Sequence, residues 1–189
     1  MATIGNESSA EVTNPARESQ QEILVRRLGW SLPMLKGVER DECDNENAVY
    51  VVSRDITGDA TACVRLLSTE SACMFSDLFG DLLGAQPPPR DPAVWEMNRF
   101  APNVRTTDEG RVLSLSQSTL DLLAAVLDFA RQQAVKRLAL VTPVAVERLL
   151  MRAGFDARRA AAPRRMPEGL FVALYIEVPE PVTANNPPF

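Results

Sequence analysis

The sequence contains no histidine, and this absence excludes several classes of active site. Imidazole is the side chain that most often acts as a general base near neutral pH, and it is a common zinc ligand. A Ser-His-Asp triad and a histidine-ligated metal centre are therefore ruled out. A reaction that needs a proton removed would have to use a carboxylate, acting directly or through a water molecule.

Cysteine and long apolar runs are also scarce. The three cysteines, Cys43, Cys63 and Cys73, are odd in number and form no C-x-x-C pair. This pattern argues against a disulfide framework or a zinc site, and it fits the reducing cytoplasm in which we expect the protein. The longest charge-free runs have nine residues, such as 138–146, whereas crossing a bilayer takes roughly 20. With no secretory signal at the N-terminus either, we expect no membrane partner.

The formal net charge of −5 conceals an uneven distribution. Residues 131–165 carry nine basic and two acidic residues, a net charge of +7, while the remainder of the chain is acidic. A basic stretch can bind an acidic partner, or it can be solvated surface, with 157–165 as a flexible Arg/Ala loop. It contains one aromatic residue, Phe155, and so lacks the stacking platform of single-stranded nucleic-acid binders. We expect no nucleic-acid partner.

Apolar segments rich in β-branched residues alternate with segments of helical period. The patterns predict strands over 48–54, 60–67, 93–100, 138–141 and 170–178, the first two forming a hairpin. Helices are predicted over 18–28 and 74–83. A third helix is predicted to begin at a capping box formed by Ser118 and Asp121, and a fourth to run from Thr142-Pro143 to Gly154. This order favours an α/β fold, a mixed sheet covered by helices. One domain is expected over 17–178, between polar tails at 1–16 and 179–189.

Three polar groups could carry chemistry. Four acids lie within residues 39–44, where they could hold a cationic ligand or form a solvated loop. Arg65 lies in an apolar strand, so it needs a partner, and either a structural salt bridge or a ligand would serve. Glu96 and Arg99 stand three residues apart in another strand, where strict alternation places them on opposite faces. Either that strand is bulged, or the two residues serve different partners.

Several short motifs occur in a fixed order along the chain. They are Arg27-Leu28-Gly29-Trp30, Glu39-x-Asp41-x-x-Asp44, Arg65-Leu66-Leu67-x-Thr69, Trp95-Glu96-x-x-Arg99-Phe100 and the stretch Val146 to Phe155. Together they resemble the LuxI-type autoinducer (N-acyl-homoserine-lactone) synthase family over residues 20–178. The resemblance implies an N-acetyltransferase-like α/β/α sandwich with a mixed twisted sheet.

The resemblance also implies a reaction. Such synthases make a bacterial quorum-sensing signal by transferring an acyl group from acyl carrier protein to the amino group of S-adenosyl-L-methionine, followed by lactonisation. S-adenosylmethionine is a substrate here, and no cofactor or metal is implied beyond it. The chain lacks the glycine-containing loop with which N-acetyltransferases hold coenzyme A, which favours a carrier protein over acetyl-CoA as donor.

The matching positions then take expected roles. Glu96 is the expected general base and Arg99 a catalytic partner for the developing oxyanion. Trp30, Asp41, Asp44 and Arg65 are expected to bind S-adenosylmethionine, whose sulfonium and amino groups suit carboxylates and an aromatic face. Leu140 and Thr142 are expected to line the acyl pocket. The basic stretch becomes a docking patch for the acidic carrier, with these residues in it: Arg158, Arg159, Arg164 and Arg165.

Two positions depart from the family pattern. Gln20 and Leu24 stand where the family has an arginine and a phenylalanine. They raise an alternative: a catalytically weakened or inactive relative that binds acyl carrier protein or another acidic partner. Asn98 likewise replaces a frequent serine.

Overall fold

The structure is a computed structural model. It describes residues 2–5, 34–35, 38–39, 47–54, 60–71, 80–100, 102, 104–109 and 112–180. The helix predicted over 18–28, most of the one predicted over 74–83, and the acidic cluster at 39–44 apart from Glu39 lie outside these ranges. Of the 74–83 prediction, the described part is a 3₁₀ turn, Gly80–Leu83.

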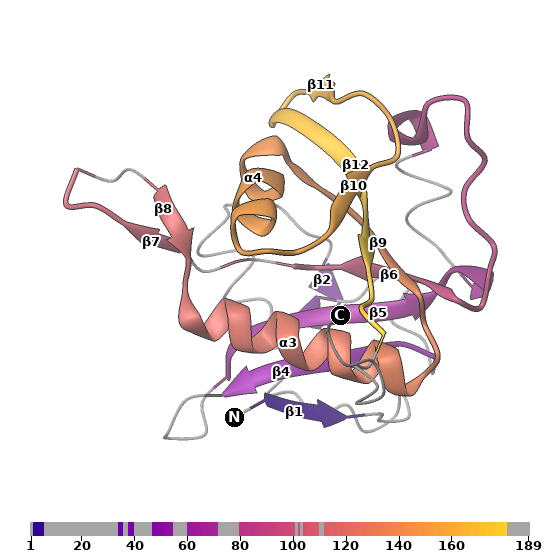
Figure 1. Cartoon of the computed structure of the whole chain (residues 1–189), viewed down its shortest axis with the longest axis horizontal. Helices are drawn as coiled ribbons and strands as arrows, with labels where there is room; N and C mark the ends of the chain where they lie inside the picture. Colours follow the sequence, from indigo (N-terminus) through magenta and orange to yellow (C-terminus); the bar gives the residue numbers. More distant parts are fainter. Residues whose placement is uncertain are drawn as a thin grey trace, which may run out of the picture.

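Eight strands form one mixed sheet in the order β1-β4-β5-β6-β9-β12-β10, with β11 paired to β12 (Figure 1). Their bounds are β1 Ala2–Gly5, β4 Val49–Arg54, β5 Ala60–Ser68, β6 Val94–Asn98, β9 Arg137–Pro143, β10 Ala157–Arg159, β11 Arg164–Met166 and β12 Gly169–Glu177. Neighbouring strands are antiparallel except β6 and β9, which run parallel. The mixed sheet and the predicted β4–β5 hairpin pairing are confirmed.

A parallel pair requires a long connection between its strands. Here the connection holds a hairpin, β7 Val104–Thr106 and β8 Val112–Leu115, and then the helix α3, Gln117–Gln132. The hairpin projects from the body of the molecule (Figure 1). A second helix, α4 Val144–Arg152, follows β9. Two further short strands, β2 Met34–Leu35 and β3 Val38–Glu39, pair only with each other, and Thr69–Ser71 is a 3₁₀ turn.

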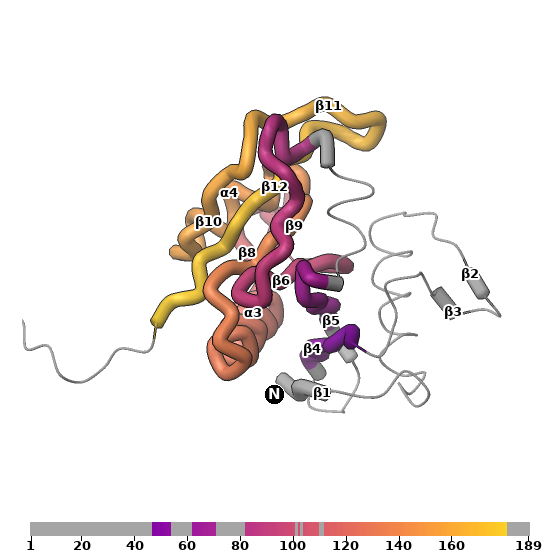
Figure 2. The backbone as a smooth tube through the Cα atoms, turned by 90° about the vertical axis from the view of Figure 1, so that its right-hand side faces the viewer, coloured from indigo at the N-terminus to yellow at the C-terminus, as the bar shows by residue number. Residues whose placement is uncertain are grey.

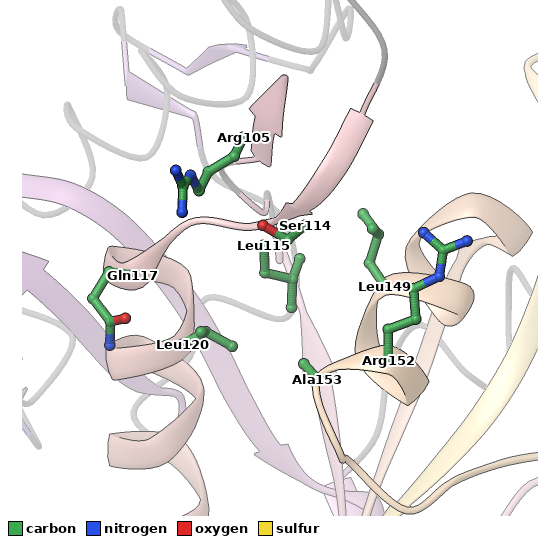
Figure 3. A pocket seen from close by; sticks show the side chains of 8 residues that line it. All are labelled: Arg105, Ser114, Leu115, Gln117, Leu120, Leu149, Arg152 and Ala153. Carbon is green, nitrogen blue, oxygen red and sulfur yellow. The ribbon is translucent and has the colours of Figure 1, made fainter. Parts of the chain in front are cut away.

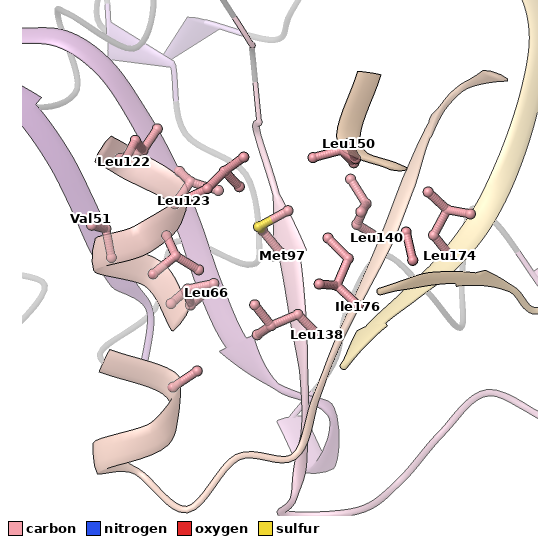
Figure 4. Close-up of a cluster of buried hydrophobic side chains, with 14 of the residues drawn as sticks. Val51, Leu66, Met97, Leu122, Leu123, Leu138, Leu140, Leu150, Leu174 and Ile176 are labelled. Atoms are coloured by element: carbon pink, nitrogen blue, oxygen red, sulfur yellow. The ribbon is translucent and has the colours of Figure 1, made fainter. Parts of the chain in front are cut away.

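Helices α3 and α4 pack on the same face of the sheet, because one apolar cluster contains residues from both helices and from six strands of that sheet (Figures 2 and 4). Its most buried members include Leu66, Met97, Leu122, Leu123, Val126, Leu138, Leu140, Leu150 and Leu174. Burying each such leucine contributes roughly 2 kcal/mol. This core fixes both helices against the sheet.

The opposite face carries two smaller clusters. One lies on β4 and β5 and includes Tyr50, Cys63 and Leu67, while the other joins β6, β9 and β12 to the turn at 80–83 through Val94 and Ala139. Side chains two residues apart on a strand share a face. Arg65, Glu96 and Asn98 therefore lie on this second face, between the two clusters.

The start of α3 differs from the prediction. The capping box predicted at Ser118 and Asp121 is wrong, because the N-cap is Ser116, whose Oγ accepts a hydrogen bond from the Thr119 backbone N–H at 3.3 Å. Ser116 has extended backbone geometry, φ −72° and ψ 162°, as an N-cap requires, and Ser118 is already helical. The Asp121 carboxylate instead accepts a hydrogen bond from the Gln117 side chain at 2.9 Å.

Two other local predictions need correction. Thr142 is not a helix N-cap, since it is still in β9, and Pro143 caps α4 without a side-chain hydrogen bond. Residues 157–165 are not a simple loop, because β10 and β11 both pair with β12. Helix α4 does end near Gly154, whose φ of +90° suits glycine. None of the helices in the described ranges combines the length and apolar character needed to span a bilayer.

Candidate active site

The strongest polar arrangement spans β5 and β6. The register places Arg65 opposite Asn98 and Leu67 opposite Glu96. Arg65 Nε donates to Asn98 Oδ1 at 2.7 Å, and Asn98 Nδ2 donates to Glu96 Oε1 at 3.2 Å. The Asn98 amide therefore connects the guanidinium to the carboxylate, with its oxygen toward the arginine and its nitrogen toward the glutamate.

Both charged ends of this row are buried. Arg65 is 0% and Glu96 2% exposed, and both interact with other groups as well. A buried charge is strongly destabilising unless it is paired and hydrogen-bonded. The Asn98 amide supplies one such hydrogen bond to the Glu96 carboxyl group, at Oε1.

Arg99 follows directly after the end of β6. The β5–β6 register is regular through Asn98, so a bulge does not explain the Glu96 and Arg99 spacing. Instead the strand ends and Arg99 takes a left-handed backbone conformation, φ +56°, with 9% exposure. Such backbone strain costs on the order of 1 kcal/mol in a non-glycine residue, and it clusters at functional sites.

The sheet changes its pairing beside Glu96. The parallel ladder between β6 and β9 ends at Glu96 and Ala139, although β9 continues to Pro143 on β12. Beyond this point the two strands no longer share hydrogen bonds, so backbone pairing is interrupted next to the carboxylate. The two predicted acyl-pocket residues, Leu140 and Thr142, lie on the part of β9 that pairs with β12 but no longer with β6, and they are 1% and 4% exposed.

Leu140 and Thr142 do not share a face with Glu96. Leu140 belongs to the helix-side core, and Thr142, two residues further along β9, lies on the same face. The structure therefore brings Arg65 and Glu96 together, and Arg99 directly follows the strand that carries Glu96. Leu140 and Thr142 lie on the opposite face of the sheet. Trp30, Asp41 and Asp44, as well as Gln20 and Leu24, lie outside the described residues.

A pocket of about 410 Å³ opens on the helix side (Figure 3). It lies between the β7–β8 hairpin, the first turn of α3 and the end of α4. Its lining combines apolar and cationic side chains: Arg105, Ser114, Leu115, Gln117, Leu120, Leu149, Arg152 and Ala153. The prediction missed this pocket because it missed the hairpin, although turn-forming residues at 107–110 between two β-branched segments are a hairpin signal.

The four arginines predicted as a docking patch are not equivalent. Arg158 holds Asp156 through two hydrogen bonds of 3.0 and 2.8 Å, which keep the pKa of that carboxyl below its usual range. Arg159 holds the buried Glu147 at 2.6 and 2.7 Å. Arg164 and Arg165 are exposed on β11. Within the described ranges no three acidic or cysteine side chains are grouped so as to hold a metal ion.

Comparison with known proteins gives consistent results. The profile of the family described as autoinducer synthase matches residues 11–183. An acyl-homoserine-lactone synthase of Ralstonia solanacearum is 37% identical over 163 residues, 84% of this chain and 78% of that protein. The family match includes every described strand and helix except β1.

Solved structures share the fold. TofI, in a ternary complex with an inhibitor and MTA, superposes with a TM-score of 0.77 at 29% identity, covering 94% of this chain and 91% of that one. BjaI, a CoA-dependent acyl-homoserine lactone synthase solved with MTA, gives 0.76 at 22% identity, covering 95% and 83%. The N-acetyltransferase-like α/β fold expected from the sequence is confirmed.

Proposed function

Because the chain belongs to the autoinducer synthase family, whose members here are acyl-homoserine-lactone synthases, we propose that it acylates S-adenosylmethionine with an acyl group carried by acyl carrier protein. The acylated intermediate then closes to a lactone. The observation that carries the proposal is the buried row of Arg65, Asn98 and Glu96 beside the place where β6 and β9 cease to pair.

The first step is acyl transfer. The amino nitrogen of S-adenosylmethionine attacks the thioester carbonyl, an amide bond forms, and the carbon–sulfur bond of the thioester breaks. Glu96, directly or through a water molecule, accepts the proton that the amine loses, and a proton passes to the departing thiolate. Arg99 stabilises the oxyanion that develops on the carbonyl oxygen. No imidazole exists in the chain to replace Glu96 in this role.

The second step is lactonisation. The carboxylate of the acylated substrate attacks its own γ-carbon, and the carbon–sulfur bond to the sulfonium breaks, which releases methylthioadenosine. The sulfonium loses its positive charge as the carboxylate loses its negative charge. Arg65 and Arg99 suit the carboxylate group of the substrate, and Trp30, Asp41 and Asp44 remain the proposed ligands of its cationic groups.

The pocket on the helix side suits the donor. Carrier protein and coenzyme A both present the acyl group on a pantetheine arm that bears a phosphate. Arg105 and Arg152 supply positive charge at the pocket, while Leu115, Leu120 and Leu149 offer apolar contact. An acyl thioester held there would reach Glu96 through the interruption between β6 and β9. Leu140 and Thr142, on the part of β9 that no longer pairs with β6, would then contact the acyl chain.

The charge distribution favours carrier protein over coenzyme A as the source of that arm. Residues 131–165 carry a net charge of +7, and Arg164 and Arg165 project from β11 into solvent. Charge complementarity of this kind raises association rates and is weakened by salt. We therefore keep Arg158, Arg164 and Arg165 as the proposed docking residues, and Arg159 receives a different role below.

The experiment is a donor panel. Purified protein is incubated with S-adenosylmethionine and with acyl-carrier or acyl-CoA thioesters of several chain lengths, and products are identified by mass spectrometry. We expect an acyl-homoserine lactone and methylthioadenosine in equal amounts, with carrier thioesters the better substrates. Turnover with acyl-CoA alone would overturn the donor assignment. No turnover with any donor, together with retained carrier binding, would favour the inactive relative that Gln20 and Leu24 suggest.

A further inference from the structure

Helix α4 is tied to the edge of the sheet by a bidentate ion pair. Arg159 Nε donates to Glu147 Oε1 at 2.6 Å, and a terminal nitrogen of Arg159 donates to Oε2 at 2.7 Å. The Glu147 side chain is 4% exposed and that of Arg159 44%. The carboxylate is thus buried under the helix, and the guanidinium reaches it from the surface.

The neighbouring pair provides a comparison. Arg158 and Asp156 are also bidentate, at 3.0 and 2.8 Å, but their side chains are 69% and 52% exposed. Exposed ion pairs contribute little to structure, whereas loss of the partner of a buried charge is strongly felt. The two pairs thus have the same chemistry and adjacent arginines, but only Glu147–Arg159 is buried on the carboxylate side and joins a helix to a strand.

The position of the pair explains what it can control. Arg159 lies opposite Leu174 on β12, and Leu174 lies opposite Leu140 on β9, so the three form a row across the helix-side face. Glu147 is on the first half of α4, and Leu149, Arg152 and Ala153, which follow it, line the pocket. The pair fixes the helix that forms one wall of that pocket.

We propose that Glu147 and Arg159 are positioning residues for the acyl donor: they hold α4, and with it the pocket wall, in place, and Arg159 acts through Glu147 rather than by touching a carrier protein. This inference rests on the proposed function, in which the pocket takes the donor arm. It reassigns an arginine that the sequence placed in the docking patch.

The two alternatives predict different donor dependence. If Arg159 docks the carrier, removing its side chain raises KM for acyl carrier protein but not for an acyl-pantetheine, which has no protein surface. If Arg159 positions α4, the same variant raises KM for both donors. For Arg159→Met we expect KM for either donor to rise about tenfold while KM for S-adenosylmethionine changes less than about twofold. Glu147→Gln should give the smaller rise, because it leaves only a half-exposed guanidinium without its partner.

Asp156→Asn is the matched control for Glu147→Gln, since each replaces a bidentate carboxylate by an amide. It should leave KM for acyl-pantetheine and KM for S-adenosylmethionine unchanged. The double variant Glu147→Gln with Arg159→Met removes the buried charge and should recover part of the loss seen in Arg159→Met. A rise in KM confined to carrier-protein donors in Arg159→Met, or an equal rise in KM for acyl-pantetheine in Asp156→Asn, would overturn the proposal.

Hydrogen exchange separates this inference from the proposed function. Amides of residues 144–152 should exchange about tenfold faster in Arg159→Met and faster in Glu147→Gln, but not in Asp156→Asn. This result is expected even if the wild-type protein shows no turnover, in which case only the proposed function fails. Unchanged hydrogen exchange of residues 144–152 in both Arg159→Met and Glu147→Gln would overturn the positioning role.

Discussion

The Arg65 guanidinium and the Asn98 side-chain amide face each other across β5 and β6, joined by a hydrogen bond of 2.7 Å. Because Asn98 Oδ1 accepts this bond, its Nδ2 is turned toward Glu96. The asparagine thus sets the environment of the proposed general base.

Asn98→Asp tests that relationship. The substitution is isosteric and keeps an acceptor for Arg65, but it places a second carboxylate beside Glu96 and removes the donor. Two adjacent carboxylates favour sharing a proton, which weakens Glu96 as a base. We expect kcat to fall about tenfold or more at neutral pH. Asn98→Ser adds no charge, so its kcat should fall less. Equal kcat values for wild type and Asn98→Asp would contradict the role of Asn98 in setting the environment of Glu96.

Arg65 should be a large contributor to stability. It is completely buried, so Arg65→Met leaves the Asn98 carbonyl oxygen and its other contacts without their donor. We expect a loss of about 3 kcal/mol or more in the free energy of unfolding, measured in urea. Arg131→Met is the control, since its ion pair with Asp128 is on the surface and should be worth less than about 1 kcal/mol. Similar losses in the two variants would contradict the account.

The helix cap gives a simpler stability test. Ser116→Ala removes the oxygen that accepts the Thr119 amide and should cost about 1 kcal/mol. Asp121→Asn changes an exposed side chain outside the cap, so it should stay within about 0.5 kcal/mol. The free energies come from urea unfolding followed by circular dichroism. A larger effect at Asp121 would restore the capping box predicted from the sequence.

The pocket can be tested with donors that differ by one group. Acyl-phosphopantetheine carries the phosphate, and acyl-pantetheine does not. The double variant Arg105→Gln with Arg152→Gln should raise KM about tenfold for the first donor and leave the second nearly unchanged. Steady-state kinetics with saturating S-adenosylmethionine provide the measurement. Equal effects on both donors would mean that the two arginines do not bind the phosphate.

Tyr175 predicts a pH dependence at the alkaline end. Burial raises the pKa of its phenol above the ordinary value of about 10, and Arg137, 5.2 Å above the ring, opposes this in part. The raised folded-state pKa means that the stabilisation is present below pH 10 and is lost as the pH rises through the folded value. Unfolding free energy measured from pH 9 upward should fall more steeply in wild type than in Tyr175→Phe. Parallel curves would contradict the shift.

Sequence reasoning predicted the strands and helices of the described domain better than their junctions. Periodicity located β4, β5, β6, β9 and β12 because buried strands leave a strong apolar signal. It could not choose between Ser116 and Ser118 as N-cap, since both precede a helical pattern and only backbone geometry separates them. The β7–β8 hairpin escaped because three of its residues, Val104, Val112 and Leu113, are exposed and give no core-facing pattern.

The candidate site shows the same division. Arg65, Glu96 and Arg99 were identified from motif order and from charge in apolar strands. The bridge through Asn98 depends on strand register, and the Arg159–Glu147 pair joins elements that sequence spacing does not bring together. Register and helix placement are set by tertiary packing, so a single sequence does not reveal them.

The most direct test of the account is the turnover of Glu96→Gln. The variant keeps the size of the side chain and can still contact Asn98, but it cannot accept the proton of the amine. With S-adenosylmethionine and the best acyl-carrier thioester, we predict that kcat for methylthioadenosine release falls at least about a hundredfold while the fold is retained. Wild-type kcat in Glu96→Gln would contradict the assignment of Glu96 as the general base.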